Sequence, residues 1–106
     1  MLLSVVFSFR NEEGIIDELL RRMHNALKGY DYELIFVNDD STDGSLALLM
    51  KHRENDKRIK IINMSKRFGV TPCVFAGLKH ANGDAVITMD TDSQDPPEII
   101  PQLIEK

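Results

Sequence analysis

Hydrophobic and polar positions alternate along this chain in blocks that predict four strands, each followed by a helix. Near-continuous apolar runs predict buried strands over residues 3–9, 32–37, 59–62 and 85–89. Between them, apolar residues recur at helical spacing, most clearly from Ile15 to Leu27. Strands that alternate with helices favour a parallel sheet, because each connection has to cross over the sheet. We therefore predict an α/β fold, a Rossmann-like parallel sheet with helices on both faces.

Capping residues predict where several of the helices begin. Asn11 is expected to cap the first helix, with Glu12 and Glu13 in its first turn. The third helix is expected over about residues 72–81. Pro96 predicts the start of a fourth helix, since proline is favoured at the first helical position. Asp43 is compatible with two roles, a cap of the second helix or a member of a site.

Composition limits the kinds of protein that this chain can be. Its 106 residues suit one domain over 1–106, and since the chain stops just after a helix opens we expect a truncated one. A formal charge of −4 argues against nucleic acid as a partner. The single cysteine, Cys73, cannot form an internal disulfide, which favours a reducing compartment. An uncovered sheet edge would favour self-association into a homo-oligomer.

The most informative chemistry lies where the fourth strand ends. Asp90 and Asp92 stand two residues apart as an apolar run opens into a loop. Two carboxylates in this position can converge on one hard cation, and Mg²⁺ or Mn²⁺ held this way keeps open positions for phosphate oxygens. This pattern predicts a metal-dependent enzyme that acts on a phosphorylated or nucleotide-linked substrate.

Other polar residues are expected at the same edge of the sheet, because parallel strands all end there. Crowded carboxylates repel one another, so a cation is their natural partner, while Lys66 and Arg67 after the third strand could meet phosphate. Plain capping roles remain open for Glu12, Glu13 and Glu98. The nine acidic residues at this edge are Glu12, Glu13, Asp39, Asp40, Asp43, Asp90, Asp92, Asp95 and Glu98.

Three blocks of the chain resemble family 2 glycosyltransferases, which have the GT-A fold. Residues 5–13 read VVFSFRNEE, residues 36–44 read FVNDDSTDG and residues 89–98 read MDTDSQDPPE. The last block is typical of the polyprenyl-phosphate branch, which includes dolichol-phosphate mannose synthase. The resemblance spans nearly the whole chain and implies the first, Rossmann-like half of a domain that binds a nucleotide sugar.

The resemblance also implies a role for individual residues. Asp39 is expected to contact the nucleotide base, and Asp90 to lie near the ribose and the metal. Asp92 and Gln94 would help Asp90 to hold Mg²⁺ or Mn²⁺. Asp92 and Asp95 would be the catalytic residues, with Asp95 facing the lipid-phosphate acceptor. The expected nucleotide-binding residues are Ser8, Glu12, Asp39, Lys66, Arg67 and Asp90.

The implied reaction transfers a sugar from a UDP- or GDP-linked donor. A polyprenyl phosphate oxygen would attack the anomeric carbon of the sugar, and nucleoside diphosphate would leave. The full-length enzyme would then be cytoplasmic and act at the inner face of the membrane, whereas this fragment alone is expected to be inactive.

Departures from the family pattern leave a second interpretation open. Ser8 stands where the family has proline, Arg10 where it has tyrosine, and Asp40 where it has the turn glycine, which predicts an altered backbone there. The chain would then be a catalytically inactive nucleotide-sugar-binding or scaffolding module. A phosphoacceptor protein is disfavoured, because it needs an aspartate after the first strand, where Phe9 and Arg10 stand.

Overall fold

The computed structural model of the chain describes residues 1–90, which form a four-stranded parallel sheet with three helices. In chain order the elements are β1 (Leu2–Phe9), α1 (Ile16–Ala26), β2 (Asp31–Asn38), α2 (Ser45–Asn55), β3 (Ile59–Asn63), α3 (Val70–Lys79) and β4 (Ala85–Asp90). All four predicted strands are confirmed, as are the three predicted helices that fall within these residues. The helix predicted from Asp95 lies outside the described residues.

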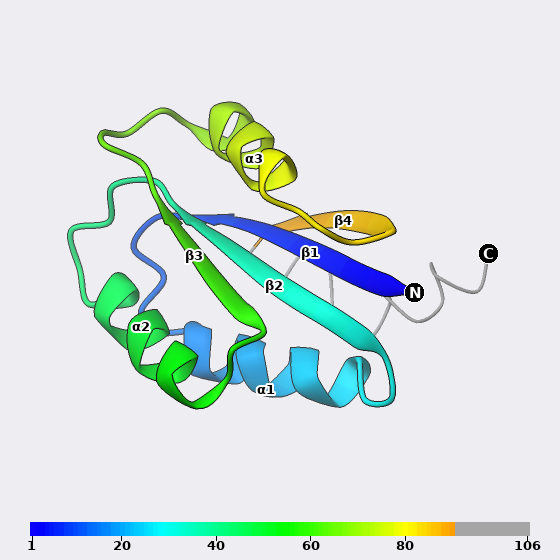
Figure 1. Ribbon diagram of the computed structural model, residues 1–106. Coiled ribbons are helices and arrows are strands. Elements are labelled where there is room, and N and C mark those ends of the chain that lie inside the picture. The colour runs from blue at the N-terminus through cyan, green and yellow to red at the C-terminus, as the bar shows by residue number, and fades with distance from the viewer. Residues whose placement is uncertain (91–106) are drawn as a thin grey trace.

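The sheet has the order β3-β2-β1-β4, and every neighbouring pair is parallel. The chain therefore builds outward from β1 to β2 and β3, and then places β4 on the other side of β1. Helices α1 and α2 cover one face of the sheet, and α3 covers the other (Figure 1). The predicted α/β fold with helices on both faces is confirmed.

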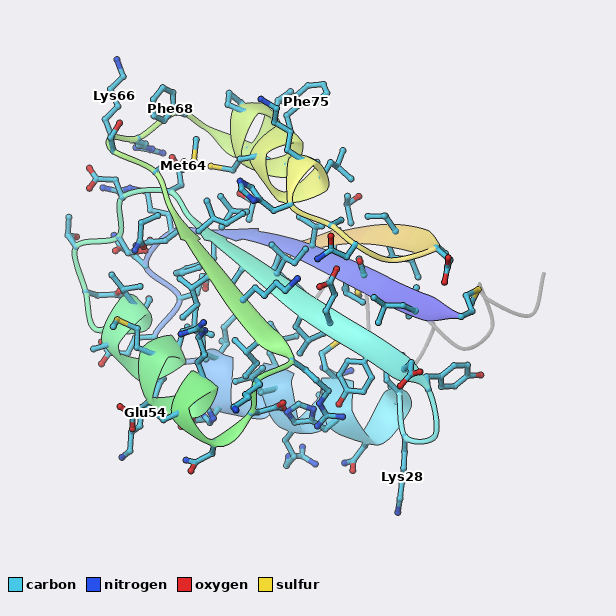
Figure 2. The ribbon with its side chains drawn as sticks, viewed as in Figure 1. Lys28, Glu54, Met64, Lys66, Phe68 and Phe75 are labelled. Atoms are coloured by element: carbon cyan, nitrogen blue, oxygen red, sulfur yellow. The ribbon has the colours of Figure 1, made fainter. Side chains whose placement is uncertain are left out.

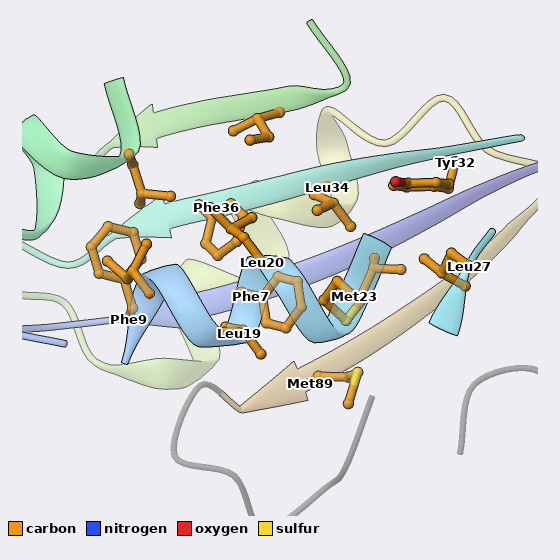
Figure 3. Packing of buried hydrophobic residues seen from close by; sticks show 14 of the residues in the cluster. Phe7, Phe9, Leu19, Leu20, Met23, Leu27, Tyr32, Leu34, Phe36 and Met89 are labelled. Carbon is orange, nitrogen blue, oxygen red and sulfur yellow. The ribbon is translucent and has the colours of Figure 1, made fainter. Parts of the chain in front are cut away.

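The larger core lies between the sheet and α1, because both inner strands turn large apolar side chains to that face. Lys28 and Glu54 mark the opposite, solvent side of this helical layer (Figure 2). Phe7 of β1 and Phe36 of β2 stack with ring centroids 4.8 Å apart. Met23 of α1 lies in the same cluster, with no exposed surface (Figure 3).

Helix α3 packs closely against the sheet because Gly77 faces it. A Cβ atom added to Gly77 would lie 2.3 Å from Cγ1 of Val6 and 3.2 Å from Cγ2 of Val37. Cys73, four residues earlier on the same helix, is fully buried against these strands. The small residues of α3 thus set the distance between the helix and the sheet.

The first helix starts later than predicted, and Asn11 does not cap it. Helix α1 begins at Ile16, and Asp17 and Glu18 occupy its first turn in place of Glu12 and Glu13. Asn11 is left-handed, with φ of 56°, and its side-chain oxygen accepts the N–H groups of Thr42 (2.7 Å) and Asp43 (3.2 Å). A tertiary contact has taken the acceptor that a local cap would have used.

Asp40 also adopts a left-handed conformation, with φ of 57°. This is the region of backbone space that glycine enters without steric cost. The prediction that an aspartate here alters the backbone is therefore wrong, because the turn keeps a glycine-type conformation. Short polar residues such as aspartate tolerate this conformation better than most, at some cost in energy.

A buried carboxylate joins three strands at the end of the sheet opposite the acidic loops. Glu33 on β2 is only 5% exposed. It accepts hydrogen bonds from Ser4 of β1, from Lys60 of β3 and from the N–H of Asn82 (2.7 Å). Burial alone would raise the pKa of Glu33, but these donors outweigh it, and the pKa lies below its ordinary value.

Replacing Glu33 should test this junction through the pH dependence of stability. Because the folded-state pKa is lowered, ionised Glu33 stabilises the fold above its ordinary pKa of 4.5, and this contribution is lost as the pH falls through the folded value. We expect Glu33→Gln to lower the free energy of unfolding by about 1–3 kcal/mol at pH 7. The difference from wild type should shrink toward pH 3 in urea titrations. Glu54→Gln, at an exposed site, is the control and should show neither effect.

The two left-handed residues form a matched pair for mutation. Asp40→Gly relieves backbone strain without removing a recorded side-chain contact, so it should raise the free energy of unfolding by up to about 1 kcal/mol. Asn11→Gly relieves the same strain but removes the acceptor of two N–H groups. It should therefore lower the free energy of unfolding by about 1–2 kcal/mol. Thermal and urea unfolding would measure both. Equal signs for the two variants would contradict the role assigned to the Asn11 side chain.

Candidate functional site

The loops that follow the strands gather at one edge of the sheet, at the carboxyl ends of β1, β2 and β3. Since β2 and β4 lie on opposite sides of β1, the topological switch point falls between β1 and β4. Ligands of open parallel sheets bind in the crevice at such a point. Ser8 marks it, because its Cα is in register with both Val37 of β2 and Asp90 of β4.

Asp39 is the central side chain of this edge. Its N–H donates to the carbonyl of Phe9 at the end of β1 (2.9 Å). Its carboxylate accepts the N–H groups of Phe68 (2.7 Å) and Gly69 (3.0 Å), directly before α3. Asp39 is only 5% exposed. It therefore fixes the start of α3 against the central strands, and the carboxylate as a whole retains lone-pair capacity beyond these bonds.

Ser8 and Cys73 lie behind Asp39 on the α3 side of the sheet. Burial, followed by the nearby Asp39 carboxylate, raises the pKa of the Cys73 thiol, while a hydrogen bond with Ser8 acts in the opposite direction. The thiol is thus neutral at physiological pH and serves as a small buried group. The expected role of Ser8 in nucleotide binding stays a prediction.

The loops after β1 and β2 are joined by a reciprocal hydrogen-bond network. Asp43 accepts the N–H and hydroxyl of Ser45 at the start of α2, and also the N–H of Glu13 (3.3 Å). Glu13 in return accepts the N–H of Gly44 (3.1 Å). The Ser45 hydroxyl is the strongest of the influences that lower the pKa of Asp43. The N-cap of α2 is Gly44, so Asp43 does not cap the helix; it anchors Ser45 from one position before the cap.

This network corrects part of the argument from crowded acids. Glu13, Asp39 and Asp43 face protein N–H donors, so their charges need no metal ion as a partner. Sequence reasoning missed this arrangement, since Ser45 carried no signal beyond its position before an apolar run. The cation expected at this edge thus depends on the block that begins at Asp90.

Two expected phosphate-binding residues lie in the loop between β3 and α3. Lys66 and Arg67 are exposed and directly precede Phe68, whose N–H is held by Asp39. The Lys66 ammonium lies 5.2 Å from the centre of the Phe68 ring (Figure 2). Glu12, on the loop after β1, donates its N–H to the hydroxyl of Ser45 (2.8 Å). The structure brings these side chains to the predicted edge, and their ligand roles stay predictions.

The expected metal ligands lie mostly beyond the described residues. Asp90 ends β4, and its backbone pairs with β1 at the switch point. Asp92, Gln94 and Asp95 lie outside residues 1–90. Within that range, no three His, Cys, Asp or Glu side chains are grouped to hold a metal ion. No helix in the same range is long and apolar enough to cross a membrane.

Known proteins resemble this chain in sequence along nearly its whole length. A bactoprenol glucosyl transferase of Shigella phage SfV is 41% identical over 108 residues, which cover 100% of this chain and 35% of that protein. A dolichol-phosphate mannosyltransferase of Pyrococcus furiosus is 40% identical over 107 residues, covering 99% and 30%. The uncharacterised glycosyltransferase YkcC of Bacillus subtilis is 42% identical over 105 residues, covering 97% and 32%. The chain spans about a third of the length of these relatives.

Solved structures resemble its fold. TarS of S. aureus (residues 1–349), in complex with UDP-GlcNAc, superimposes with a TM-score of 0.81 at 27% identity, covering 99% of this chain and 30% of that one. The mannosyltransferase PcManGT of Pyrobaculum calidifontis, in complex with GDP-Man and Mn²⁺, gives a TM-score of 0.79 at 24% identity, covering 92% and 29%. The predicted GT-A-type fold is confirmed by these similarities.

The motif resemblance and the fold agree with the family comparison. The sequence profile of the family "Glycosyl transferase family 2" matches residues 4–106, which is almost the entire chain. The chain belongs to glycosyl transferase family 2.

Proposed function

We propose that residues 1–106 form the donor-binding part of a glycosyltransferase that transfers a sugar from a nucleotide sugar to a polyprenyl phosphate. The observation that carries this proposal is the 40–41% identity to a bactoprenol glucosyl transferase and a dolichol-phosphate mannosyltransferase. Both relatives are named for a sugar and a polyprenyl-type acceptor. The acidic edge of the sheet lies where a nucleotide would bind in this fold.

The described residues suit the donor half of such a site. Asp39 is a carboxylate acceptor at the carboxyl edge of the sheet, and acceptors of this kind bind the N–H groups of a nucleotide base. Lys66 and Arg67 supply positive charge in the neighbouring loop, where a diphosphate would bring negative charge. We assign these three residues, with Ser8, Glu12 and Asp90, to the nucleotide.

A divalent cation fits the chemistry of the block that follows β4. Asp90, Asp92 and Gln94 offer only oxygen ligands, the kind that Mg²⁺ and Mn²⁺ prefer. When bound there, the ion would stabilise the negative charge of the departing diphosphate. Asp95 is assigned to the acceptor side. An acceptor phosphate is already ionised near neutral pH, so the chain needs no strong general base to activate it.

Donor binding by this chain can be measured directly. We would titrate UDP-glucose and GDP-mannose by calorimetry, with Mn²⁺ and with EDTA, into wild type, Asp92→Ala and the exposed control Glu54→Gln. We expect one of the two donors to bind, with an affinity that Mn²⁺ raises in wild type and the control. Asp92→Ala should lose at least tenfold of that affinity, since it removes a charged metal ligand.

The results separate the proposal from its alternative. If this chain binds neither donor, the same titration on the whole protein decides, and no binding there would contradict donor recognition. Binding that ignores Mn²⁺ and Asp92 would contradict the metal site. For the reaction itself, the whole protein should transfer radiolabelled sugar to undecaprenyl phosphate. Donor binding without transfer by the whole protein would favour an inactive nucleotide-sugar-binding module.

A further inference from the structure

Arg10 is the one residue in the described part of the chain with a buried side-chain donor and no partner. Its Nε atom is shielded from water and makes no hydrogen bond. Buried donors are nearly always paired, because leaving one unpaired destabilises the fold. An unpaired, charged donor in a native fold therefore indicates a ligand that the donor is built to meet.

The neighbouring acids do not supply this partner. The carboxylates of Glu13, Asp39 and Asp43 lie in the adjoining loops and accept protein N–H groups. None of the ion pairs recorded within residues 1–90 involves Arg10. Among residues 1–90 the guanidinium therefore has no ion-pair partner, although three carboxylates lie in the adjoining loops.

Arg10 lies at the edge of the sheet that carries the candidate site. Arg10 is the first residue after β1, the strand that flanks the topological switch point. It directly follows Phe9, whose carbonyl accepts the N–H of Asp39. A group held here lies between the loop that carries Asp39 and the end of β4.

We propose that Arg10 binds the phosphate oxygens of the nucleotide donor. The proposal rests on the function proposed above, because it takes the ligand to be a nucleotide diphosphate. The guanidinium fork matches phosphate oxygens with two parallel hydrogen bonds. Stacking of the guanidinium on the base is the other contact open to arginine, but stacking would leave Nε without an acceptor. A bound phosphate would neutralise the positive charge of the guanidinium and would accept a hydrogen bond from Nε.

Arg10 is also where this chain departs from the tyrosine usual in its family. A tyrosine can offer a ring and a hydroxyl but no positive charge. A charge-based phosphate contact by Arg10 is therefore one that tyrosine at this position could not make.

The test compares ligands that differ only in their phosphates. Uridine and UDP, and guanosine and GDP, would be titrated in EDTA into ¹⁵N-labelled chain, with binding followed by NMR chemical shifts. In Arg10→Gln we expect the affinity for the matching diphosphate to fall about 10- to 100-fold, with nucleoside affinity within about twofold of wild type. Arg10→Lys should retain part of the diphosphate affinity as a point charge. Arg53→Gln, an exposed cation on α2, is the control and should behave as wild type.

Each of the other possible results of this titration would contradict a specific part of the proposal. Unchanged diphosphate affinity in Arg10→Gln would overturn the phosphate contact alone. Equal losses for nucleoside and diphosphate would overturn it in favour of stacking on the base. If neither the wild-type chain nor the whole protein binds nucleotide, the proposed function and this assignment are overturned together. Arg10→Tyr, which carries the family residue, keeps the test decisive if Arg10→Gln fails to fold, and should show the same selective loss.

Discussion

Parallel pairing of β1 with both β2 and β4 is the constraint on which the chemistry of this chain depends. Parallel strands end at one edge, so the loops after them are brought together whatever their sequences. The two pairings place Ser8 in register with Val37 and with Asp90. Val37 and Asp90, 53 positions apart in the sequence, thereby flank Ser8 from the two neighbouring strands. Gly77 allows α3 to pack closely against the sheet, and the Phe68–Gly69 turn before this helix is thereby placed within hydrogen-bonding distance of Asp39.

Carboxylates at this edge divide into those that build the site and those left for ligands. Asp43 and Glu13 connect two loops, and their acceptor oxygens are directed to backbone N–H groups. Asp39 does both, since it anchors the turn before α3 and keeps lone pairs on the same oxygens. A fold that uses carboxylates as loop anchors can hold many acids at one edge without mutual repulsion, because N–H dipoles offset their charges.

The strands and the fold class could be predicted from sequence because buried parallel strands read as nearly unbroken apolar runs. The edge of the sheet that carries the polar residues followed from topology alone. Helix starts were less predictable. Asn11 was expected to cap the first helix, but its side-chain oxygen accepts the N–H groups of Thr42 and Asp43, which are distant in sequence. Asp40 in a left-handed turn and the partners of Asp43 likewise depend on tertiary contacts. The sequence marked Arg10 only as a departure from the family pattern, and the packed structure is needed to reveal that its Nε is buried without a partner.

Glu33 and Arg10 show what a buried charge can indicate in this fold. Glu33 lies on β2 and Arg10 directly follows β1, the two central strands of the sheet. Each has polar side-chain atoms that are buried away from water. Glu33, at the amino end of the sheet, is met by Ser4, Lys60 and a backbone N–H, as a structural charge should be. Arg10, at the carboxyl end, is met by none of the described residues. Proteins tend to satisfy every local rule except where function requires otherwise, and here the exception falls at the end of the sheet where a ligand would bind.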